Sequence, residues 1–383
     1  MSTPNALSSF HHEPPEASSR DRIALVDRLR GWVILWMALD HARGFLQPAG
    51  VSPEDLTTTT IPFFLMRWIT HLCAPTFVLL AGVSCWLVAR GRDLSPLRSH
   101  LLRRGLVLMA LEVTWVSFSW SFGFQATYLG VLWAIGGSLV LLSFLVGRSP
   151  ALVGGLGLGL TILFASADVA SWNPVFDALC RAQKFEIFGH PFHSFYLIGP
   201  WFGVMAMGYG LAPWFTLRDL SNRLTALGAG LIVGFVALRG VNGWGDPSPW
   251  TAQEGEAWRT LFGFFNPSKY PPSLLFLMMT LGVVFLCAPL LPRLKGPLAT
   301  MMDTCGKTAL FFYLLHLPLL HGAAWCISHL VYGTSRPPEG EPVSYLLICG
   351  AWIGVCMMLT PLCRRWREAK KNHGKRQPWM RYL

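Results

Sequence analysis

Apolar runs long enough to cross a lipid bilayer fill most of this sequence, and they constrain its fold more than any other feature. A helix of about 20 apolar residues spans the hydrocarbon core of a membrane. Of the 383 residues, 52% are hydrophobic and only 13% are charged, which is too apolar for a soluble protein of this size. We therefore predict an all-α fold, a polytopic integral membrane helical bundle of about ten transmembrane helices. The runs lie near residues 23–46, 61–89, 99–118, 126–147, 151–168, 194–214, 222–240, 271–291, 307–330 and 343–363.

The loops between these runs differ in charge, and this difference orients the bundle. If the amino terminus is cytoplasmic, every short loop on that side is basic, as in the stretch from Arg90 to Arg104. The loops on the other side include two longer ones, residues 169–193 and 241–270, in which acidic residues offset the basic ones. Basic loops stay on the cytoplasmic side of a membrane. We expect both termini in the cytoplasm and a multi-pass protein of the inner (plasma) membrane.

The ends of the chain are polar and set the domain boundaries. Residues 1–21 read as a disordered cytoplasmic arm, residues 22–363 as one transmembrane domain, and residues 364–383 as a basic cytoplasmic tail. The tail holds eight basic residues and one acidic residue, and so supplies most of the net charge of +11. We attribute this charge to retention on the cytoplasmic side and contact with anionic lipid, and we expect no nucleic-acid partner.

The first apolar run carries six ionisable residues, at positions 27, 28, 30, 40, 41 and 43. An ionisable group near the bilayer centre costs roughly 3 kcal/mol or more, so it faces a bundle interior, pairs with another group or does chemistry. Arg30 and His41 are separated by three helical turns, which puts them on one face roughly 16 Å apart along the axis. Asp27 lies on the same face, beside Arg30. This face predicts a polar path from the cytoplasmic edge towards the far side.

The second run contains a polar pair next to a helix breaker. Arg67 and His71 are four residues apart and share a helix face, and Pro75 removes the amide that would bond the carbonyl of His71. We expect a kink there, beside a buried polar pocket, because freed backbone groups cannot be left facing lipid. The alternative is a kinked packing helix whose Arg67 reaches to the outer surface.

Glu112 is an intramembrane carboxylate on the third run. Its expected partners are Arg67, Arg43 or Arg104. A buried ion pair that fixes helix register and a catalytic carboxylate explain Glu112 equally well.

Further polar residues fall at the predicted outer edge or in later runs. His193 lies at the start of the sixth run, and Lys269 and Tyr270 precede the eighth, where each is either an interfacial anchor or a ligand for a sugar or carboxylate. His316 shares a face of the ninth run with Tyr313. No carboxylate or cysteine stands at ligand spacing from His316, so we expect no metal site. The chain also has no P-loop, GxSxG, HExxH or GxGxxG motif.

Five segments together resemble one family. They are DRLRGWVILWMALDHARGF, HLCAPTFVLLAG, GPWFGVMAMGYG, FNPSKYPPSLLFLMMTLG and GKTALFFYLLHLPLLH. In this order they resemble bacterial membrane proteins grouped with heparan-α-glucosaminide N-acetyltransferase, from about residue 22 to about residue 363. The resemblance implies a membrane acyltransferase that moves an acyl group, usually acetyl, from cytoplasmic acyl-CoA to a sugar or glycan acceptor on the outer face.

The resemblance also implies roles for single residues. It puts Arg30, with Asp27 beside it, near the acyl-CoA donor and His41 near the transfer point, with His71 as the second candidate. A neutral histidine would act as general base on an acceptor hydroxyl or amine, or carry the acyl group itself, and Asp40 or Glu112 would orient it. Residues expected on the acceptor side are Arg43, Arg67, His193, Lys269, Tyr270 and His316. Acetyl-CoA or another acyl-CoA is the expected cofactor, without a metal.

A proton-coupled transporter or flippase for a small polar or glycan substrate is the competing hypothesis. It would use His41, Glu112 and His71 as a proton relay and show two halves related by pseudo-symmetry. An acyltransferase would instead show one continuous polar cavity beside Arg30 and His41 with room for CoA. The expected partners are the lipid bilayer, acyl-CoA and a hydroxyl or amine acceptor, and an oligomer is compatible with the sequence.

Overall fold

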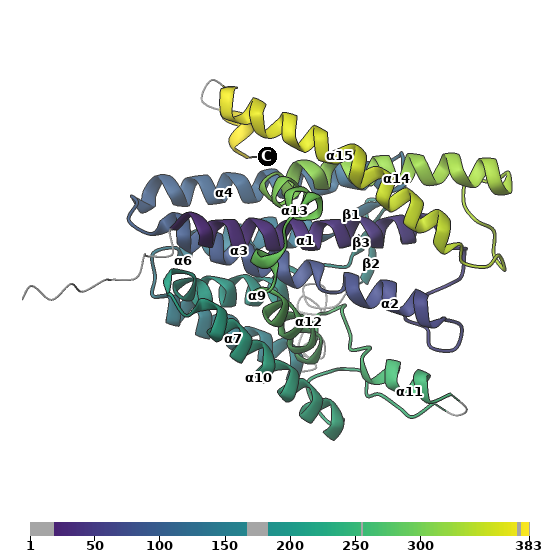
Figure 1. The fold of residues 1–383 in the computed structure, drawn as a ribbon, viewed down its shortest axis with the longest axis horizontal. Helices are drawn as coiled ribbons and strands as arrows, with labels where there is room; N and C mark the ends of the chain where they lie inside the picture. The colour runs from purple at the N-terminus through teal and green to yellow at the C-terminus, as the bar shows by residue number, and fades with distance from the viewer. Residues whose placement is uncertain (1–18, 167–182, 254–255, 374–376, 383) are drawn as a thin grey trace, which may run out of the picture.

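The computed structural model describes residues 19–166, 183–253, 256–373 and 377–382. The described chain is mostly helical, and many of its helices run along the long axis of the molecule with α1 through the middle (Figure 1). The helices are α1 (Ser19–Leu46), α2 (Ile61–Thr70), α3 (Cys73–Ala89), α4 (Leu94–Leu111), a π-helical turn (Glu112–Val116), α5 (Ser117–Ser121), α6 (Val131–Leu145), α7 (Pro150–Ser166), α9 (Ile198–Leu211), α10 (Leu220–Val241), α11 (Ala257–Phe264), α12 (Leu274–Cys287), α13 (Pro297–Lys307), α14 (Ala309–Tyr332) and α15 (Tyr345–His373). Short 3₁₀ turns cover Ala212–Thr216, Leu291–Arg293 and Pro378–Arg381.

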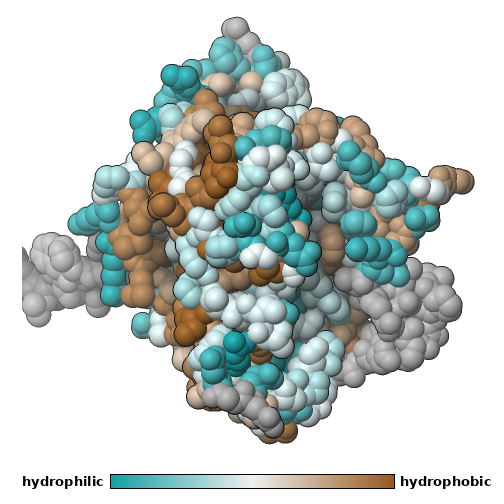
Figure 2. Space-filling view, turned by 90° about the vertical axis from the view of Figure 1, so that its right-hand side faces the viewer, coloured by the Kyte–Doolittle hydropathy of each residue, from teal (hydrophilic) through white to brown (hydrophobic). Residues whose placement is uncertain are grey.

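Five helices of the described chain are long and apolar enough to cross a membrane. They are Ile61–Ala89, Leu220–Val241, Leu274–Arg293, Ala309–Tyr332 and Tyr345–His373, and two shorter apolar helices cover Val131–Leu145 and Pro150–Phe164. This supports a helical membrane protein; the count of ten spans stays a prediction. The end of the molecule at which α1 finishes is largely hydrophilic, with hydrophobic residues gathered in a strip along one side (Figure 2).

A small sheet departs from the all-α prediction. Its strands are β1 (Thr127–Leu129), β2 (Gln183–Ile187) and β3 (His190–Ser194), in the order β1-β3-β2. The central strand β3 pairs with β1 in parallel and with β2 in antiparallel orientation. Aromatic and β-branched residues in these short segments favour the extended form. The predicted runs 126–147 and 194–214 consequently become helical only at Val131 and Ile198.

Two helices fall in stretches that the hydropathy pattern assigns to loops. The first is α11, in the predicted outer loop 241–270, and the second is α13, between the eighth and ninth runs. The predicted disordered arm, for residues 1–18, and much of the predicted loop 169–193 lie outside the described residues.

Glycines bring α13 and α1 into backbone contact. A Cβ added at Gly31 would lie 1.8 Å from the carbonyl oxygen of Met302, and one at Gly306 would lie 1.8 Å from that of Asp27. No other residue fits this crossing, because small residues alone let helix backbones approach so closely. An ion pair of 2.6 Å between Arg28 and Asp303 ties the same two helices together.

The second apolar run breaks where the sequence predicts a kink. Helix α2 ends at Thr70 and α3 begins at Cys73, so His71 and Leu72 lie between them. Pro75 then occupies the first turn of α3, where a missing amide costs little. The break allows Arg67 and Thr70, at the end of α2, to face α1.

Candidate functional site

Two adjoining cavities lie inside the bundle. The first, which we call the histidine cavity, has a volume of about 290 Å³ and is lined by His41, Asp40, Arg67 and Lys269 among others. The second, the basic cavity, has a volume of about 400 Å³ and is lined by Arg30, Arg104, Lys307 and Lys370 among others. Both cavities are lined by Met37, Phe77, Val131 and Tyr313, which we call the shared wall. The two cavities thus meet at these mostly apolar residues, where the sequence analysis expects one continuous polar cavity for an acyltransferase.

One face of α1 runs along both cavities. Arg30 and Met37 line the basic cavity, and Met37, Asp40 and His41 line the histidine cavity. This spacing of three to seven residues follows the period of an α-helix. The prediction that Arg30 and His41 share a face is confirmed, and so is the position of Asp27, whose carboxylate lies 3.4 Å from the Arg30 guanidinium.

The imidazole of His41 is oriented by a second histidine. Nδ1 of His41 lies 2.7 Å from Nε2 of His316, which is fully buried on α14. Nδ1 of His316 lies 2.7 Å from the backbone carbonyl of Tyr313. A carbonyl only accepts, so His316 Nδ1 carries the proton and donates it, and His316 Nε2 accepts from His41 Nδ1. This assignment leaves the lone pair on Nε2 of His41.

Asp40 is held by cations and does not orient His41. One carboxylate oxygen lies 2.8 Å from Nη1 of Arg67, and the other lies 2.9 Å from Nη2 of Arg43. The hydroxyl of Thr70 donates to the same carboxylate at 2.9 Å. The predicted orienting carboxylate is therefore replaced by His316, because Asp40 already neutralises two buried arginines.

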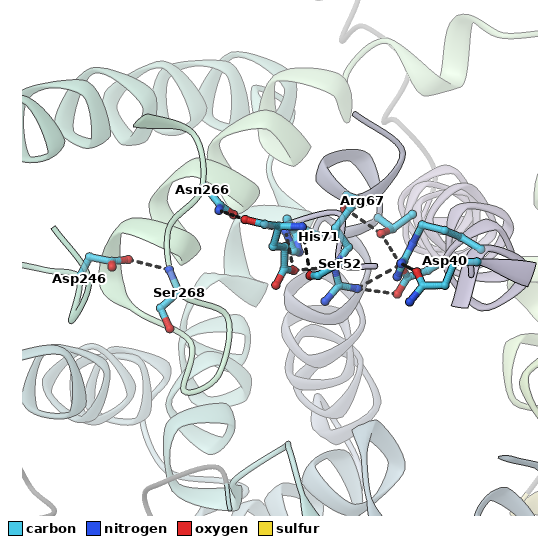
Figure 3. A network of polar contacts seen from close by, with 11 residues as sticks. Asp40, Ser52, Arg67, His71, Asp246, Asn266 and Ser268 are labelled. Carbon is cyan, nitrogen blue, oxygen red and sulfur yellow. Dashed lines mark hydrogen bonds and ion pairs between the residues drawn. The ribbon is translucent and has the colours of Figure 1, made fainter. Parts of the chain in front are cut away.

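The loop between α1 and α2 supplies a carboxylate that the sequence analysis did not single out. Glu54 lies 2.6 Å from Nε of Arg67 and 3.6 Å from Nε2 of His71. Figure 3 shows Arg67 and His71 side by side in this polar network. Asn266 donates to the Glu54 backbone carbonyl at 3.1 Å. Burial by itself would raise the pKa of Glu54, but Arg67 and then His71 outweigh it and lower that pKa to about 2. Its position in a polar loop gave no signal of this contact.

Glu112 interacts with a helix start and not with the predicted arginines. It begins the π-helical turn and is 1% exposed. Its Oε2 accepts a hydrogen bond of 2.8 Å from the amide of Leu132, in the first turn of α6. Free amides and the helix dipole at such an end favour an anion. Glu112 still lines the histidine cavity.

Lys269 is a buried cation that makes no close ion pair within the described chain. It is 7% exposed, and it interacts with Asp40 and Glu54 only at longer range. Nζ lies 5.2 Å from the ring centroid of Tyr270 and 5.9 Å from that of Tyr196, distances typical of cation–π contacts. The histidine cavity is further lined by the aromatic residues Trp120, Tyr128 and Phe195.

The structure gathers seven of the twelve predicted site residues around the histidine cavity, and Arg30 lines the basic cavity. His71 is 3% exposed and packs edge-on against Phe276, and His193 sits on β3 with its ring edge-on to Tyr128. These two histidines, Asp27 and His316 line neither of the two cavities. The predicted residues that line the histidine cavity are Asp40, His41, Arg43, Arg67, Glu112, Lys269 and Tyr270.

The basic cavity contains four cations from four separate helices. Arg30 on α1 donates to the Ser84 hydroxyl at 2.5 Å, and Arg104 comes from α4, Lys307 from α13 and Lys370 from α15. No aspartate or glutamate belongs to its lining within the described chain. Such a cavity suits a ligand with several negative charges. Of these four residues the sequence analysis placed only Arg30 at the donor site. It named Arg104 as a partner for Glu112, and Lys307 and Lys370 read as loop and tail charges.

A family comparison agrees with this picture. A family model described as heparan-alpha-glucosaminide N-acetyltransferase, catalytic, matches residues 22–241, which is more than half of the chain and covers α1 to α10. The matched part includes His41 and Glu112 but not α12 to α15, so two of the five resembling segments lie outside it. No curated protein matches the chain. The chain therefore belongs to the heparan-alpha-glucosaminide N-acetyltransferase catalytic family of membrane acyltransferases.

Proposed function

We propose that this protein transfers an acyl group, in the first place acetyl, from acyl-CoA in the basic cavity to an acceptor in the histidine cavity. The observation that carries this proposal is the His41–His316 pair, which presents a free imidazole nitrogen beside the shared wall of two cavities with different chemistry. The acceptor is a hydroxyl or amine of a sugar or glycan. Family membership supports the acyl transfer and the acetyl-CoA donor.

The basic cavity supports binding of the donor. Guanidinium and ammonium groups bind phosphate oxygens through charge-assisted hydrogen bonds, and CoA carries phosphates at its nucleotide end. The thioester at the other end would reach the shared wall, one turn of α1 before His41. The basic loops flank the same end of the bundle as Arg30, so the donor enters from the cytoplasm in an inner-membrane protein of ten spans.

The histidine cavity supports binding of a sugar. Aromatic side chains pack against the apolar faces of sugar rings, and Tyr128, Tyr196 and Tyr270 line this cavity. Arg67 is already saturated by Asp40 and Glu54, whereas Lys269 has donors to spare. Lys269 is therefore the residue that we assign to an acceptor oxygen.

The reaction moves one proton through His41. Nε2 of His41 takes the proton from the acceptor O–H or N–H while that oxygen or nitrogen attacks the thioester carbonyl. The C–S bond breaks, and the leaving CoA thiolate takes this proton from Nε2, which returns His41 to its neutral form. The His41 Nδ1 proton stays on its hydrogen bond to His316 and keeps the ring in place. The same Nε2 is also positioned to carry the acyl group, and trapping an acyl-histidine would distinguish this route from direct transfer.

The test is binding and turnover of radiolabelled acetyl-CoA by the purified protein in nanodiscs. We expect saturable binding by wild type and loss of transfer in His41→Ala with binding retained. His329→Ala is the matched control, because His329 is an exposed histidine on the same helix as His316. A monodisperse protein that fails to bind acetyl-CoA would contradict the proposal, and proton-coupled flux in vesicles would then be measured.

A further inference from the structure

Arg239, in the last turn of α10, is a buried arginine that the proposed reaction does not use. Its guanidinium donates to the backbone carbonyls of Ser248, Gly263 and Phe264 at 3.0 to 3.1 Å. Nη1 also lies 3.7 Å from Oδ1 of Asp246, and the two side chains are each only 2% exposed. One arginine thus gathers three carbonyls and one carboxylate from the loop between α10 and α12.

Asp246 links this loop to the residues in front of α12. Its Oδ2 accepts a hydrogen bond of 2.8 Å from the amide of Ser268 (Figure 3) and one of 2.7 Å from the hydroxyl of Ser273. The Ser273 amide donates to the Ser268 carbonyl at 3.0 Å. These bonds fix both ends of residues 268–273, which we call the strap. The strap contains Lys269, which lines the histidine cavity.

The same loop also contacts the loop that carries Glu54. Asn266, just before the strap, donates to the backbone carbonyl of Glu54 at 3.1 Å, and Arg259 of α11 donates to that of Leu56. Glu54 in turn pairs with Arg67, which lines the histidine cavity. The loop between α10 and α12 therefore supports this cavity at two separate points.

A carboxylate is the group that the contacts of Asp246 require. Its Oδ1 accepts from the Ser248 amide at 2.9 Å and faces Arg239, while Oδ2 takes both bonds from the strap. A carboxylate presents only acceptors, whereas an amide of the same shape would turn its NH₂ group towards one of these donors. Arg239 supplies the opposite charge that a buried carboxylate needs. Loss of this carboxylate should therefore loosen the strap.

We infer that Arg239 and Asp246 are positioning residues of the acceptor site, and that they act by holding Lys269 against the acceptor oxygen. This inference rests on the proposed function for the role of Lys269. Neither Arg239 nor Asp246 belongs to the described lining of the two cavities, so both act through the strap. Asp246 also lies beyond the residues 22–241 that the family model matches.

The first experiment measures acetyl transfer from radiolabelled acetyl-CoA to free glucosamine, which offers both hydroxyl and amine groups, by the full-length protein in nanodiscs. Asp246→Asn should raise KM for glucosamine about tenfold, the loss expected for one charged hydrogen bond. The Kd for acetyl-CoA should stay within about twofold, because no strap residue belongs to the described lining of the basic cavity. Asp219→Asn is the control, since it changes an exposed aspartate just before the same helix α10 and should leave both values within about twofold.

A double-mutant cycle tests whether Asp246 acts through Lys269. Lys269→Ala alone should raise KM for glucosamine about tenfold, for the same reason as Asp246→Asn. The double variant should stay within about threefold of Lys269→Ala, because the two substitutions remove one shared interaction. Independent effects would multiply to about 100-fold and would contradict the inference.

Hydrogen–deuterium exchange, followed by mass spectrometry, provides a readout that does not depend on the acceptor. The amides of Ser268 and Ser273 should exchange faster in Asp246→Asn than in wild type, and at the wild-type rate in Asp219→Asn. Unchanged exchange in Asp246→Asn would overturn the inference, whatever the protein transfers. Wild type that does not acetylate glucosamine would overturn the proposed function and the role of Lys269 together, and the exchange rates would still decide whether Asp246 holds the strap.

Melting temperatures of the variants check folding. If Asp246→Asn melts early, Ser273→Ala takes its place, because it leaves the Arg239–Asp246 pair intact and removes only one of the two bonds from Asp246 to the strap. It should change KM and exchange in the same direction, by less. No change in either quantity would overturn the inference.

Discussion

Nδ1 of His41 lies 2.7 Å from Nε2 of His316, although 275 positions separate the two residues in the chain. Their ring planes differ by only 20°, so the hydrogen bond runs close to both planes. Because the Tyr313 carbonyl fixes the His316 tautomer, it also determines which nitrogen of His41 is free. We therefore propose that His316 is a positioning residue, with a role separable from that of His41.

Replacing His316 by leucine should lower kcat for acetyl transfer by about 10²-fold, at the low end of what a positioned general base contributes. KM for acetyl-CoA should hardly change, because His316 does not line the basic cavity. Steady-state kinetics in nanodiscs measures both.

His316→Gln is the discriminating variant, because its amide oxygen can accept from His41 Nδ1 in place of the lost nitrogen. We expect it to recover part of the lost kcat. Equal kcat values for His316→Gln and His316→Leu would mean that His316 only fills space.

Asp40→Asn should lower the stability of the fold more than a substitution that breaks an exposed ion pair. The substitution leaves Arg43 and Arg67 buried with one partner fewer, and breaking a buried ion pair costs about 3–5 kcal/mol. Denaturation of the purified protein in mild detergent measures the loss. The matched control is Asp219→Asn, which breaks an exposed pair with Arg223 and should cost under about 1 kcal/mol. Similar losses for both variants would show that the Asp40 network is not a stabilising unit.

Helical periodicity made part of the site predictable. Arg30 and His41 follow the period of α1, and the cost of burying charge explains why Asp40, Arg67 and Glu112 face an interior. The hydropathy runs likewise located the long helices. Each of these inferences needs only residues within one segment or the energetics of one side chain.

The pairings between segments could not be predicted in the same way. Glu112 reaches the start of α6 because a π-helical turn and a short strand intervene, and hydropathy shows neither. Glu54 and Lys370 lie in stretches with ordinary loop and tail composition, and their positions follow from how the chain returns to the bundle. The sequence alone does not show how close such segments lie in the folded protein.

The contacts of Glu54 with Arg67 and His71 should make the stability of the protein depend on pH. The pKa of Glu54 is lowered to about 2 from an ordinary value of 4.5 by its cationic neighbours. A carboxyl whose folded pKa is lowered contributes stability above its unfolded pKa and loses it as the pH falls through the folded value. Wild type should therefore lose stability progressively between about pH 5 and pH 2.

Glu54→Gln provides the comparison, since it removes the charge and keeps the shape. It should melt below wild type at pH 7, and the two melting curves should converge near pH 2. A difference in melting temperature between the two proteins that stays constant from pH 7 to pH 2 would mean that the charge of Glu54 contributes nothing to the stability of the fold.

The shared wall should control transfer without controlling donor binding. Val131 begins α6, is partly buried and lines both cavities, so a larger side chain there would occupy the space where they meet. Val131→Phe should lower kcat at least about tenfold, because a shift of about 1 Å in a reacting group already costs up to 10²-fold. The Kd for CoA should stay within about twofold, since we propose that the phosphates bind among the cations of the basic cavity and not at the shared wall. If Val131→Phe instead weakened CoA binding as much as it slowed transfer, the wall would belong to the donor site itself and the division into two cavities would have no role in the reaction.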